Sequence, residues 1–500
     1  MKILSASEIR EADNFTIQNE PVTSLALMER AALASYQWII EKYNNFSFTI
    51  FCGPGNNGGD GLAIARMLEE SGHSVSTIII PGENRSTDIE ENLKKVNKVS
   101  EYDSASTQIT ENTVIIDAIF GTGINRNTSG IAADAILLIN NSRNTVISID
   151  IPSGIFPDKH TNEKNGPVVI ADHTLTFEFY KLAFLFSENN KYIGELVVLQ
   201  IGIHKGYVPS GEACNEVTDE EAVRKIIKPR MSYSHKGNYG HSLLICGSFG
   251  KIGAAILAAR ACLRSGVGLL TVQIPSCGYI VMQSSVPEAM VIADEEKIIS
   301  NSIDASRFHT IGIGPGIGTA VRTINAFEQI VSNYNKPMVI DADGINIMAE
   351  NKVWLAKTPT ESIFTPHPKE FERLAGNSAN DFERHELQLK FSKLHKVYVV
   401  LKGKFTCITC PDGSCYFNPT GNPGMAKAGS GDTLTGIITA LLSQGYTPKE
   451  SCIAGVYLHG LAADLALEKF GENALLASDI IDHIGKAFIE IQEERFEAGR

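Results

Sequence analysis

Short, β-rich apolar runs alternate with helical patterns along most of this chain. The runs FTIFCG, VSTIII, TVIIDAIFGTG, TVISIDIPSG, HTLTFEF and GELVVLQIGI follow one another between residues 48 and 203. Several are apolar along their whole length, as strands buried on both faces of a parallel sheet are. The alternation predicts a doubly wound α/β fold, in which ligands sit beyond the carboxyl ends of the strands.

The rhythm lapses once, near GYVPSGEACNEVTDEE, and then restarts with HSLLICGS, GKIGAAILAARACLRSG and LLTVQIP. A chain of 500 residues is also longer than one domain usually is. We therefore predict two α/β domains, residues 1–210 and residues 217–500, the second with helices at both of its ends.

The composition and net charge of the chain limit the kinds of molecule and membrane with which the protein is expected to associate. The net charge of -13 argues against a nucleic-acid-binding protein, which needs a basic surface for phosphate contacts. The first residues, MKILSASEIREADNFT, lack the apolar core of a targeting segment, and Ser5 and Glu8 are spaced as a helix capping box. Because there is no run of about 18 apolar residues and the cysteines are scattered, we expect a cytoplasmic protein that does not span a membrane.

One local group of cysteines, CITCPDGSC at residues 407–415, needs separate treatment. PDG is a turn signal between the strand-like runs VYVVLKGKFTCIT and SCYF, so we predict a hairpin with incidental thiols. A metal or redox site is the alternative, but no second cysteine pair completes four zinc ligands.

A glycine-rich turn with added polar residues follows the first strand-like run. GPGNNGGDG contains the spacing G-x-G-x-x-G, after a predicted strand and before a helical pattern. Such glycines let the backbone approach a pyrophosphate, whose charge the helix N-terminus stabilises. Asn57, Asp117 and Ser153 follow different strands and offer the oxygen ligands that a hard cation prefers. An aspartate at one strand end is more often a cap or turn former, but three such turns at one sheet edge favour a site.

In this order, GPGNNGGDG, DAIFGTG and DIPSG resemble the YjeF N-terminal family, the epimerases of hydrated NAD(P)H, called NAD(P)HX. The resemblance covers residues 1–210 and implies a three-layer Rossmann-like fold with K+ held by Asn57, Asp117 and Ser153. It also implies these substrate contacts: Asn56, Asn57, Gly58, Gly59, Asp60, Gly121, Thr122, Gly123, Ile124, Asn125, Arg126, Asn127 and Asp150. We favour Asp150 over Asp117 as the catalytic acid/base, because the resemblance assigns Asp117 to the ion.

A second glycine-rich turn, GSGD, precedes a helical pattern in which Leu434, Ile437 and Leu441 share one face. Asp432 therefore lies in the first turn of a predicted helix. The glycines beside it leave backbone N–H groups open to a transferring phosphoryl group, and we expect the helix dipole to keep the carboxylate ionised as a base. A plain helix cap is the alternative reading, which the run of small residues before Asp432 disfavours.

The runs GIGPGIG, DADG, TPHPKEFERL, VLKGKFT and NPGMAKAGSGD resemble the YjeF C-terminal family, the ribokinase-like NAD(P)HX dehydratases, over residues 217–500. No Walker A spacing is present. The resemblance implies Asp432 as the catalytic base and Ala254, Gly316, His367 and Asp432 as substrate contacts. With Mg2+ and ADP or ATP as cofactors, it implies that the adenine nucleotide is bound by Lys402, Gly403, Lys404, Phe405, Thr406, Gly429, Ser430 and Gly431.

Together the two resemblances imply a metabolite-repair enzyme. One domain interconverts R- and S-NAD(P)HX, and the other dehydrates the S form to NAD(P)H at the expense of ADP or ATP. We expect a homo-oligomer whose partners are these small molecules. The alternative is a ribokinase-like kinase for a vitamin precursor, fused to a non-catalytic nucleotide-binding module; a stable phosphorylated product is its signature.

Overall fold

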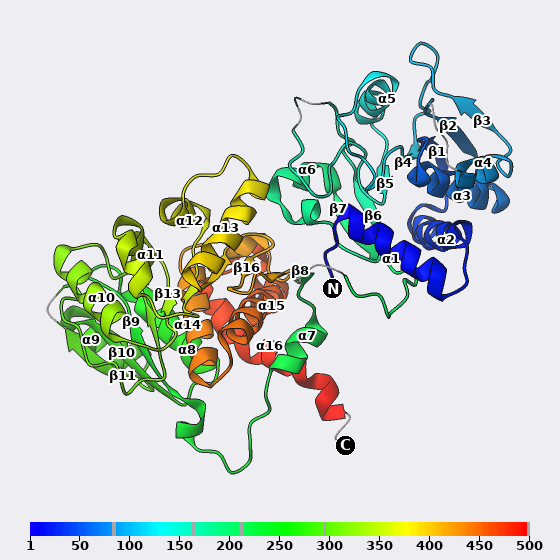
Figure 1. Cartoon of the computed structure of the whole chain (residues 1–500). Helices are drawn as coiled ribbons and strands as arrows, with labels where there is room; N and C mark the ends of the chain where they lie inside the picture. The colour runs from blue at the N-terminus through cyan, green and yellow to red at the C-terminus, as the bar shows by residue number, and fades with distance from the viewer. Residues whose placement is uncertain (83–86, 163, 165, 210–214, 295–296, 498–500) are drawn as a thin grey trace. The chain divides into compact units, whose positions relative to one another are not determined.

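The computed structural model describes residues 1–82, 87–162, 164, 166–209, 215–294 and 297–497, with side chains through residue 492. The chain divides into two compact units (Figure 1), Met1–Glu212 with Asn380–Phe382 and Ala213–Ala379 with Glu383–Arg500. The expected boundary, residues 211–216, falls largely on residues 210–214, which lie outside the described residues.

The described strands of the first unit form one sheet in the order β3-β2-β1-β4-β5-β6-β7. Every pairing in it is parallel. The strands are β1 (Ser47–Cys52), β2 (Val75–Ile79), β3 (Val99–Glu101), β4 (Thr113–Ala118), β5 (Val146–Ile149), β6 (His173–Phe177) and β7 (Glu195–Leu199). The sequence pattern predicts all of these except β3, which is three residues long and exposed.

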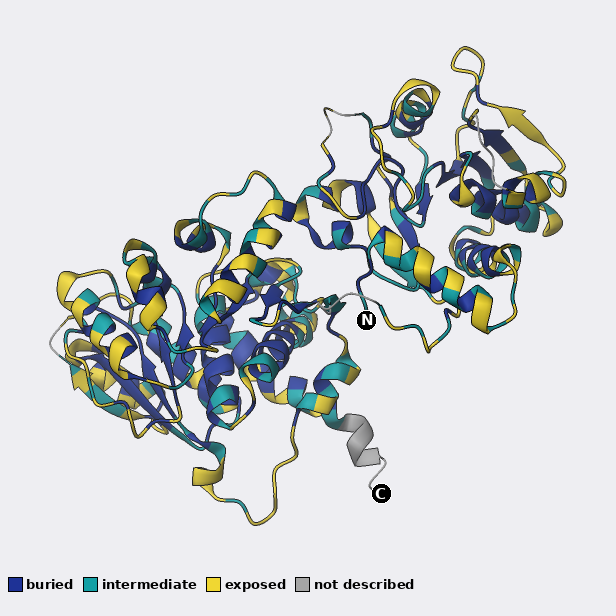
Figure 2. Ribbon diagram, viewed as in Figure 1, coloured by how far each residue is buried: buried dark blue, intermediate teal, exposed yellow. Residues whose placement is uncertain are grey.

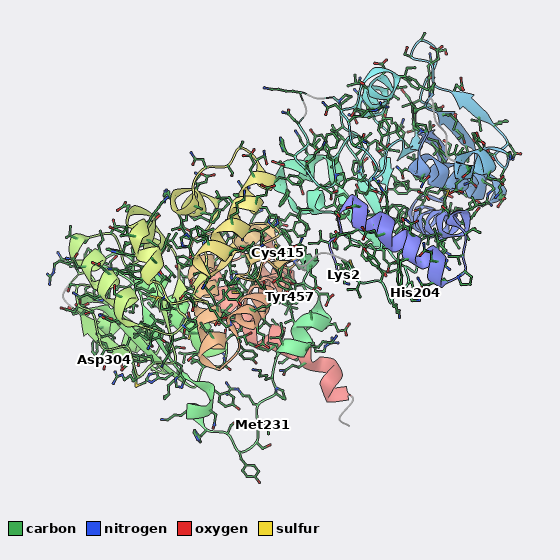
Figure 3. The ribbon with its side chains drawn as sticks, viewed as in Figure 1. Lys2, His204, Met231, Asp304, Cys415 and Tyr457 are labelled. Atoms are coloured by element: carbon green, nitrogen blue, oxygen red, sulfur yellow. The ribbon has the colours of Figure 1, made fainter. Side chains whose placement is uncertain are left out.

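Helices cover both faces of this sheet. They are α1 (Ala6–Asn19), α2 (Ser24–Tyr43), α3 (Asn56–Glu70), α4 (Thr87–Leu93), α5 (Gly130–Asn141) and α6 (Asn190–Ile193), with short 3-10 turns at Leu182–Leu185 and Ser187–Asn189. On one face, α2 and α3 bury Ile39 and Leu62 against Ile50 and Ile116 of the strands. On the other face, the apolar side chains of α5 pack against the strands. The result is the three-layer Rossmann-like arrangement, with the central strands mostly dark blue between the helices in Figure 2.

The second unit holds a longer sheet in the order β11-β10-β9-β12-β13-β14-β15-β16-β17-β8. Its parallel part runs from β11 to β15, and β16 is antiparallel to both of its neighbours. The strands are β8 (Asn215–Val217), β9 (His241–Ile245), β10 (Leu269–Pro275), β11 (Met290–Asp294), β12 (Thr310–Ile313), β13 (Val339–Ile340), β14 (Ile363–Phe364), β15 (Tyr398–Leu401), β16 (Cys407–Thr409) and β17 (Cys415–Phe417).

Helices also flank this sheet on both faces. They are α7 (Glu220–Ile226), α8 (Ile252–Arg264), α9 (Tyr279–Ser285), α10 (Val321–Asn333), α11 (Asp343–Glu350), α12 (Pro368–Ala375), α13 (Asp381–His395), α14 (Ser430–Ser443), α15 (Pro448–Ala474) and α16 (Ala477–Glu497). The side chains of α14, α15 and α16 form one core with Val339, Ile363 and Val400 of the strands. On the opposite face, Phe391 of α13 packs edge-on against Phe364.

Two local predictions are confirmed and a third is wrong. The capping box of Ser5 and Glu8 at the start of α1 is confirmed. The hairpin across residues 410–414 is also confirmed, because β16 pairs with β17 in antiparallel register. The single strand-like run VYVVLKGKFTCIT, however, is two strands, β15 and β16, separated by a turn at residues 402–406. Within the described part of the chain, no helix has the length and apolar character needed to cross a membrane.

Each parallel sheet reverses its strand order once, between β1 and β4 in the first unit and between β9 and β12 in the second. Such a reversal opens a crevice at the carboxyl ends of the strands, because the following loops diverge to opposite faces. The predicted glycine-rich turns and aspartates follow strands at these edges or begin helices there. The fold therefore concentrates the candidate residues at one end of each sheet.

One close helix contact gives a prediction about stability. Gly436 of α14 lies against α8, and a Cβ there would be 2.2 Å from the carbonyl oxygen of Ala258. We expect Gly436→Ala to lower the free energy of unfolding of the second unit by about 1–3 kcal/mol, because the helices must separate. Urea unfolding in a Trp38→Phe background, with Trp354 as the reporter, measures this change.

The matched control is Gly485→Ala in α16, where an added Cβ meets no atom within 4 Å. That substitution should raise the free energy of unfolding by about 0.5–1 kcal/mol, since alanine is the better helix former. Equal effects of the two substitutions would contradict the packing argument.

Candidate functional sites

The glycine-rich turn after β1 is held against the neighbouring strand. A Cβ on Gly53 would lie 1.8 Å from the carbonyl oxygen of Ile119, just beyond β4, and a Cβ on Gly58 would lie 1.9 Å from the Gly53 oxygen. Only glycine fits at these approaches. Gly55 is the N-cap residue of α3 and has no side chain to cap it. The backbone N–H groups of the first helical turn therefore stay available to a ligand in the crevice.

A pocket of about 1400 Å³ opens beside this turn. Among the predicted substrate contacts it is lined by Asn56, Asn57, Asp60, Gly121, Thr122, Gly123, Ile124, Asn125, Arg126, Asn127 and Asp150. Gly58 and Gly59 are buried beneath it and do not line it; a Cβ on Gly59 would meet the Met28 side chain at 2.7 Å. These two glycines are therefore explained by close packing of α3.

Asp150 is held in the pocket by strain and by charge. It follows β5 with a φ of 67°, a left-handed conformation that a non-glycine residue adopts only when its surroundings enforce it. Its carboxylate accepts a hydrogen bond from the Thr122 N–H at 2.9 Å and forms an ion pair with Lys181 Nζ at 2.7 Å. Lys181 is 1% exposed and also donates to Thr176.

Two further carboxyl groups share this pocket. Burial raises the pKa of Asp13 to about 6, with a contribution from Asp150, while Lys181 acts in the opposite direction. Burial also raises the pKa of Asp60 well above its ordinary value, and Asp150 and Asp13 add to that shift. The pocket thus combines carboxyl groups with raised pKa values and one ion-paired carboxylate. This is a pattern found at proton-transfer sites.

Sequence reasoning misses Asp13 and Lys181. Lys181 follows β6, so its polar side chain just beyond a strand end is a signal that the sequence carries. Asp13 lies inside α1, and nothing in its neighbourhood distinguishes it from a surface aspartate of an amphipathic helix.

The three predicted ion ligands are all buried; Asn57 lines the pocket, whereas Asp117 and Ser153 are not among its lining residues. Asp117 is fully buried and accepts hydrogen bonds from Ser148 Oγ at 2.7 Å, Ser153 Oγ at 2.6 Å and Ser153 N–H at 2.9 Å. Burial raises the pKa of Asp117, and these hydrogen bonds oppose that shift. Asn57 donates from Nδ2 to the Ile149 oxygen, but its Oδ1 is buried without a hydrogen-bond partner. An orphaned amide oxygen and a buried carboxylate are the kinds of oxygen ligand that a hard cation prefers.

In the second unit, Asp432 lies in the first turn of α14, as predicted. Gly429 is the N-cap residue of this helix. Its φ of 95° is a left-handed conformation that glycine adopts without strain, and no side chain caps the helix start. Burial raises the pKa of Asp432 to about 6, and the nearby Asp341 adds to the shift. With a pKa of about 6 the carboxylate is mostly ionised at neutral pH, so its expected role as a base stays a prediction; desolvation is the main cause of the upward shift.

A lysine–aspartate pair stands beside Asp432. Lys402 Nζ is 3.0 Å from Asp341 Oδ1, and Thr435 of α14 donates to the other oxygen of Asp341 at 2.8 Å. A Cβ on Gly431 would lie 3.3 Å from Lys402 Nζ, so the glycine brings the start of α14 against this pair. Ala342, between Asp341 and Asp343, has a φ of 48°, which is a second strained non-glycine residue after a strand.

The other predicted residues lie around this group to different degrees. Ala254 and Gly316 adjoin each other, since a Cβ on Gly316 would be 3.2 Å from the Ala254 Cβ. His367 begins α12 in a capping box with Glu370, whose carboxylate is 4.0 Å from Lys402 Nζ. The turn that carries Gly403, Lys404 and Phe405 is closed by Thr406, whose Oγ1 accepts from the Gly403 N–H and donates to its oxygen.

Three side chains of this site are missing from the sequence prediction. Asp341 is the first aspartate of the motif DADG, and the sequence pattern alone indicates no role for it. Ser430 Oγ is 3.4 Å from Nε2 of His459 in α15, and burial, helped by Lys402, lowers the pKa of His459 to about 4. Asn422 donates to Asp464 at 2.8 Å and so fixes the loop before the glycine-rich turn.

Comparison with known proteins agrees with this division of the chain. The family described as YjeF-related protein N-terminus matches residues 24–183, and the family described as NAD(P)H-hydrate dehydratase matches residues 242–486. A solved structure of the ADP/ATP-dependent NAD(P)H-hydrate dehydratase from Bacillus subtilis, co-crystallised with ATP and Mg2+, is 32% identical. The match covers 55% of this chain and 98% of the solved chain, with a TM-score of 0.49.

Relatives that match the whole chain are also known. The bifunctional NAD(P)H-hydrate repair enzyme Nnr of Moorella thermoacetica is 32% identical over 99% of this chain and 98% of the relative. The enzyme of the same name from Escherichia coli is 30% identical over 95% of this chain and 92% of the relative. The chain therefore belongs to the family of bifunctional NAD(P)H-hydrate repair enzymes.

Proposed function

We propose that the first unit, about residues 1–210, epimerises R- and S-NAD(P)HX, and that the second, about residues 217–500, dehydrates the S form with ADP or ATP. One observation carries this division of labour. Each unit has its own carboxyl group with a raised pKa, beside a lysine–aspartate pair and a glycine-started helix. This supports one site in each unit, because an uncapped helix start suits a phosphate group and a carboxyl group with a raised pKa suits proton transfer.

Dehydration begins with activation of a poor leaving group. We assign Asp432 to remove the proton from the C6 hydroxyl of S-NAD(P)HX, so that its oxygen attacks the terminal phosphoryl of the nucleotide. The N–H groups of Gly429, Ser430 and Gly431 and the ammonium of Lys402 would balance the charge of the transferring group. The ring nitrogen then expels phosphate, and loss of the C5 proton restores NAD(P)H. The other product is AMP from ADP, or ADP from ATP.

Epimerisation needs a proton donor, a proton acceptor and a site for a cationic intermediate. Protonation lets the C6 hydroxyl leave as water, which gives a ring iminium, and water then returns to the opposite face and releases a proton. We assign Asp150 as the acid/base that receives this proton, and Asp13, with its pKa of about 6, as the donor. The pocket loop Gly121–Asn127 and the turn Asn56–Asp60 would hold the substrate.

The residues also fit two cations. Asn57 Oδ1, Asp117 and Ser153 would hold K+ in the first unit, where it would supply a fixed positive charge beneath the substrate loops. In the second unit Asp343 is close enough to Asp432 to raise its pKa, and Glu370 is 4.0 Å from Lys402 Nζ; the oxygens of these carboxylates would suit Mg2+. Mg2+ bound to the nucleotide neutralises phosphate charge during transfer. We also propose a homo-oligomer of the reducing cytoplasm; the described cysteines are all free, which supports that compartment.

The first prediction separates the two activities. Asp432→Asn should lower dehydration of S-NADHX by about 10²–10⁴-fold, because the positioned base is lost, while epimerisation stays intact. Recovery of NADH absorbance with ADP or ATP measures dehydration, and chromatography of the two epimers measures epimerisation. In the wild type, kcat/KM for dehydration should rise as pH passes about 6, where Asp432 ionises, and then level off.

Near-normal NADH recovery by Asp432→Asn would contradict this assignment. A phosphorylated product that accumulates without NADH would instead favour the kinase alternative.

The second prediction concerns the buried lysine. Lys181→Met removes the positive charge that lowers the pKa of Asp13, so epimerisation should fall by about 10²-fold and its pH optimum should move upward. The exposed Lys159 provides the control, since Lys159→Met should change neither. Trp38 fluorescence in a Trp354→Phe background checks that the first unit is folded. An unchanged pH optimum in a folded Lys181→Met protein would refute the proposed role.

The third prediction tests the potassium site by a readout besides activity. Unfolding of the first unit, followed by Trp38, should need more urea in KCl than in choline chloride of equal strength, because an ion that binds only the folded state stabilises it. Asn57→Ala should abolish this difference, and Asp117→Ala should weaken epimerisation while dehydration is spared. Equal stability of the wild type in both salts would rule out the ion site.

A further inference from the structure

The face of α13 that packs on the sheet is polar at its centre. His385, Gln388 and Ser392 are spaced at i, i+3 and i+7 and are 6%, 0% and 0% exposed. A helix face buried against strands is normally apolar. Gln388 Nε2 donates to the oxygens of Val399 and Cys407, whereas its Oε1 is buried with no hydrogen-bond partner. A buried polar face of this kind requires a physical reason.

Two buried thiols meet this face. Cys407 of β16 and Cys415 of β17 are diagonal neighbours in the antiparallel register, and their Sγ atoms are 3.3 Å apart. Cys407 Sγ is 3.7 Å from His385 Nδ1. All three ligand atoms lie within 4.8 Å of one another, and this is the one such group of three His, Cys, Asp or Glu residues found among the described residues.

We propose that His385, Cys407 and Cys415 bind one thiophilic metal ion of the Zn2+ class. Tetrahedral zinc with Zn–S bonds of about 2.3 Å separates two sulfurs by roughly 3.8 Å, so the sulfurs need to move apart by only a few tenths of an ångström. Two thiolates and an imidazole are ligands that Zn2+ prefers over Mg2+ or K+. The unpartnered Oε1 of Gln388, one turn beyond His385, gives an oxygen in the same layer for the fourth position, directly or through water.

The site has a structural consequence for the proposed nucleotide site. Cys407 directly follows the turn at residues 402–406, and His385 belongs to the helix packed over β16. A metal ion would fasten the start of β16 to α13 and so limit the movement of that turn. A disulfide between the same cysteines is the competing chemistry, and it needs an oxidant and diagonal partners close enough to bridge.

Titration of the reduced, metal-free full-length protein with Co2+ tests the proposal. Tetrahedral cobalt bound to thiolates gives intense ligand-to-metal and d–d absorption, which Co2+ at an oxygen-lined Mg2+ site does not give. We expect these bands to saturate at one equivalent of Co2+ and to be abolished by an equivalent of Zn2+. Cys407→Ser and Cys415→Ser should each lose them.

The matched control is Cys410→Ser, which alters a buried cysteine of the same hairpin whose side chain packs in the core with α15. It should keep the full cobalt spectrum. Loss of the bands in Cys410→Ser equal to that in Cys407→Ser would overturn the ligand assignment. If the cysteine variants fail to fold, the wild type alone decides: absence of thiolate–cobalt absorption, or a Cys407–Cys415 disulfide in a protein that binds no Co2+ after reduction, would overturn the proposal.

Discussion

Both candidate sites depend on glycines that let loops from neighbouring strands touch. A Cβ on Gly53 would lie 1.8 Å from the Ile119 oxygen in the first unit, and a Cβ on Gly314 would lie 1.8 Å from the Asp341 oxygen in the second. Any side chain at either place would push adjacent strand ends apart. Near these contacts, Asp150 and Ala342 adopt left-handed backbone conformations, which non-glycine residues keep only when their surroundings enforce them.

The two candidate sites also have the same arrangement of charged side chains. In each unit one lysine forms an ion pair with a strand-end aspartate, Lys181 with Asp150 and Lys402 with Asp341. A second carboxyl group nearby then has its pKa raised by burial. Removal of water from these groups makes their mutual interactions stronger than at a surface, so one cation affects several carboxyl groups at once. This supports proton transfer as the shared chemical capability of the two units.

Much of the molecule follows from local patterns of residues. The fully apolar runs predict buried parallel strands, and their alternation with helical patterns predicts two α/β domains. Glycine-rich turns before helices locate Asn57 and Asp432 at helix starts, which the structure has. The split between β15 and β16 escapes this reasoning, because VYVVLKGKFTCIT is strand-like throughout and only the antiparallel pairing of β15 with β16 shows where the chain turns.

The order of the elements, the two α/β units and the residues at strand ends can all be predicted from the sequence, since they depend on neighbours within a few positions. The sharing of one environment by distant side chains, in contrast, depends on the three-dimensional fold. Asp13 joins Asp150 and Lys181 although it lies in the first helix, and His385 joins two cysteines of a hairpin. The raised pKa of Asp432 also depends on burial and on side chains that are distant in the sequence. Burial and Coulomb interactions depend on distances through space, which no local pattern specifies.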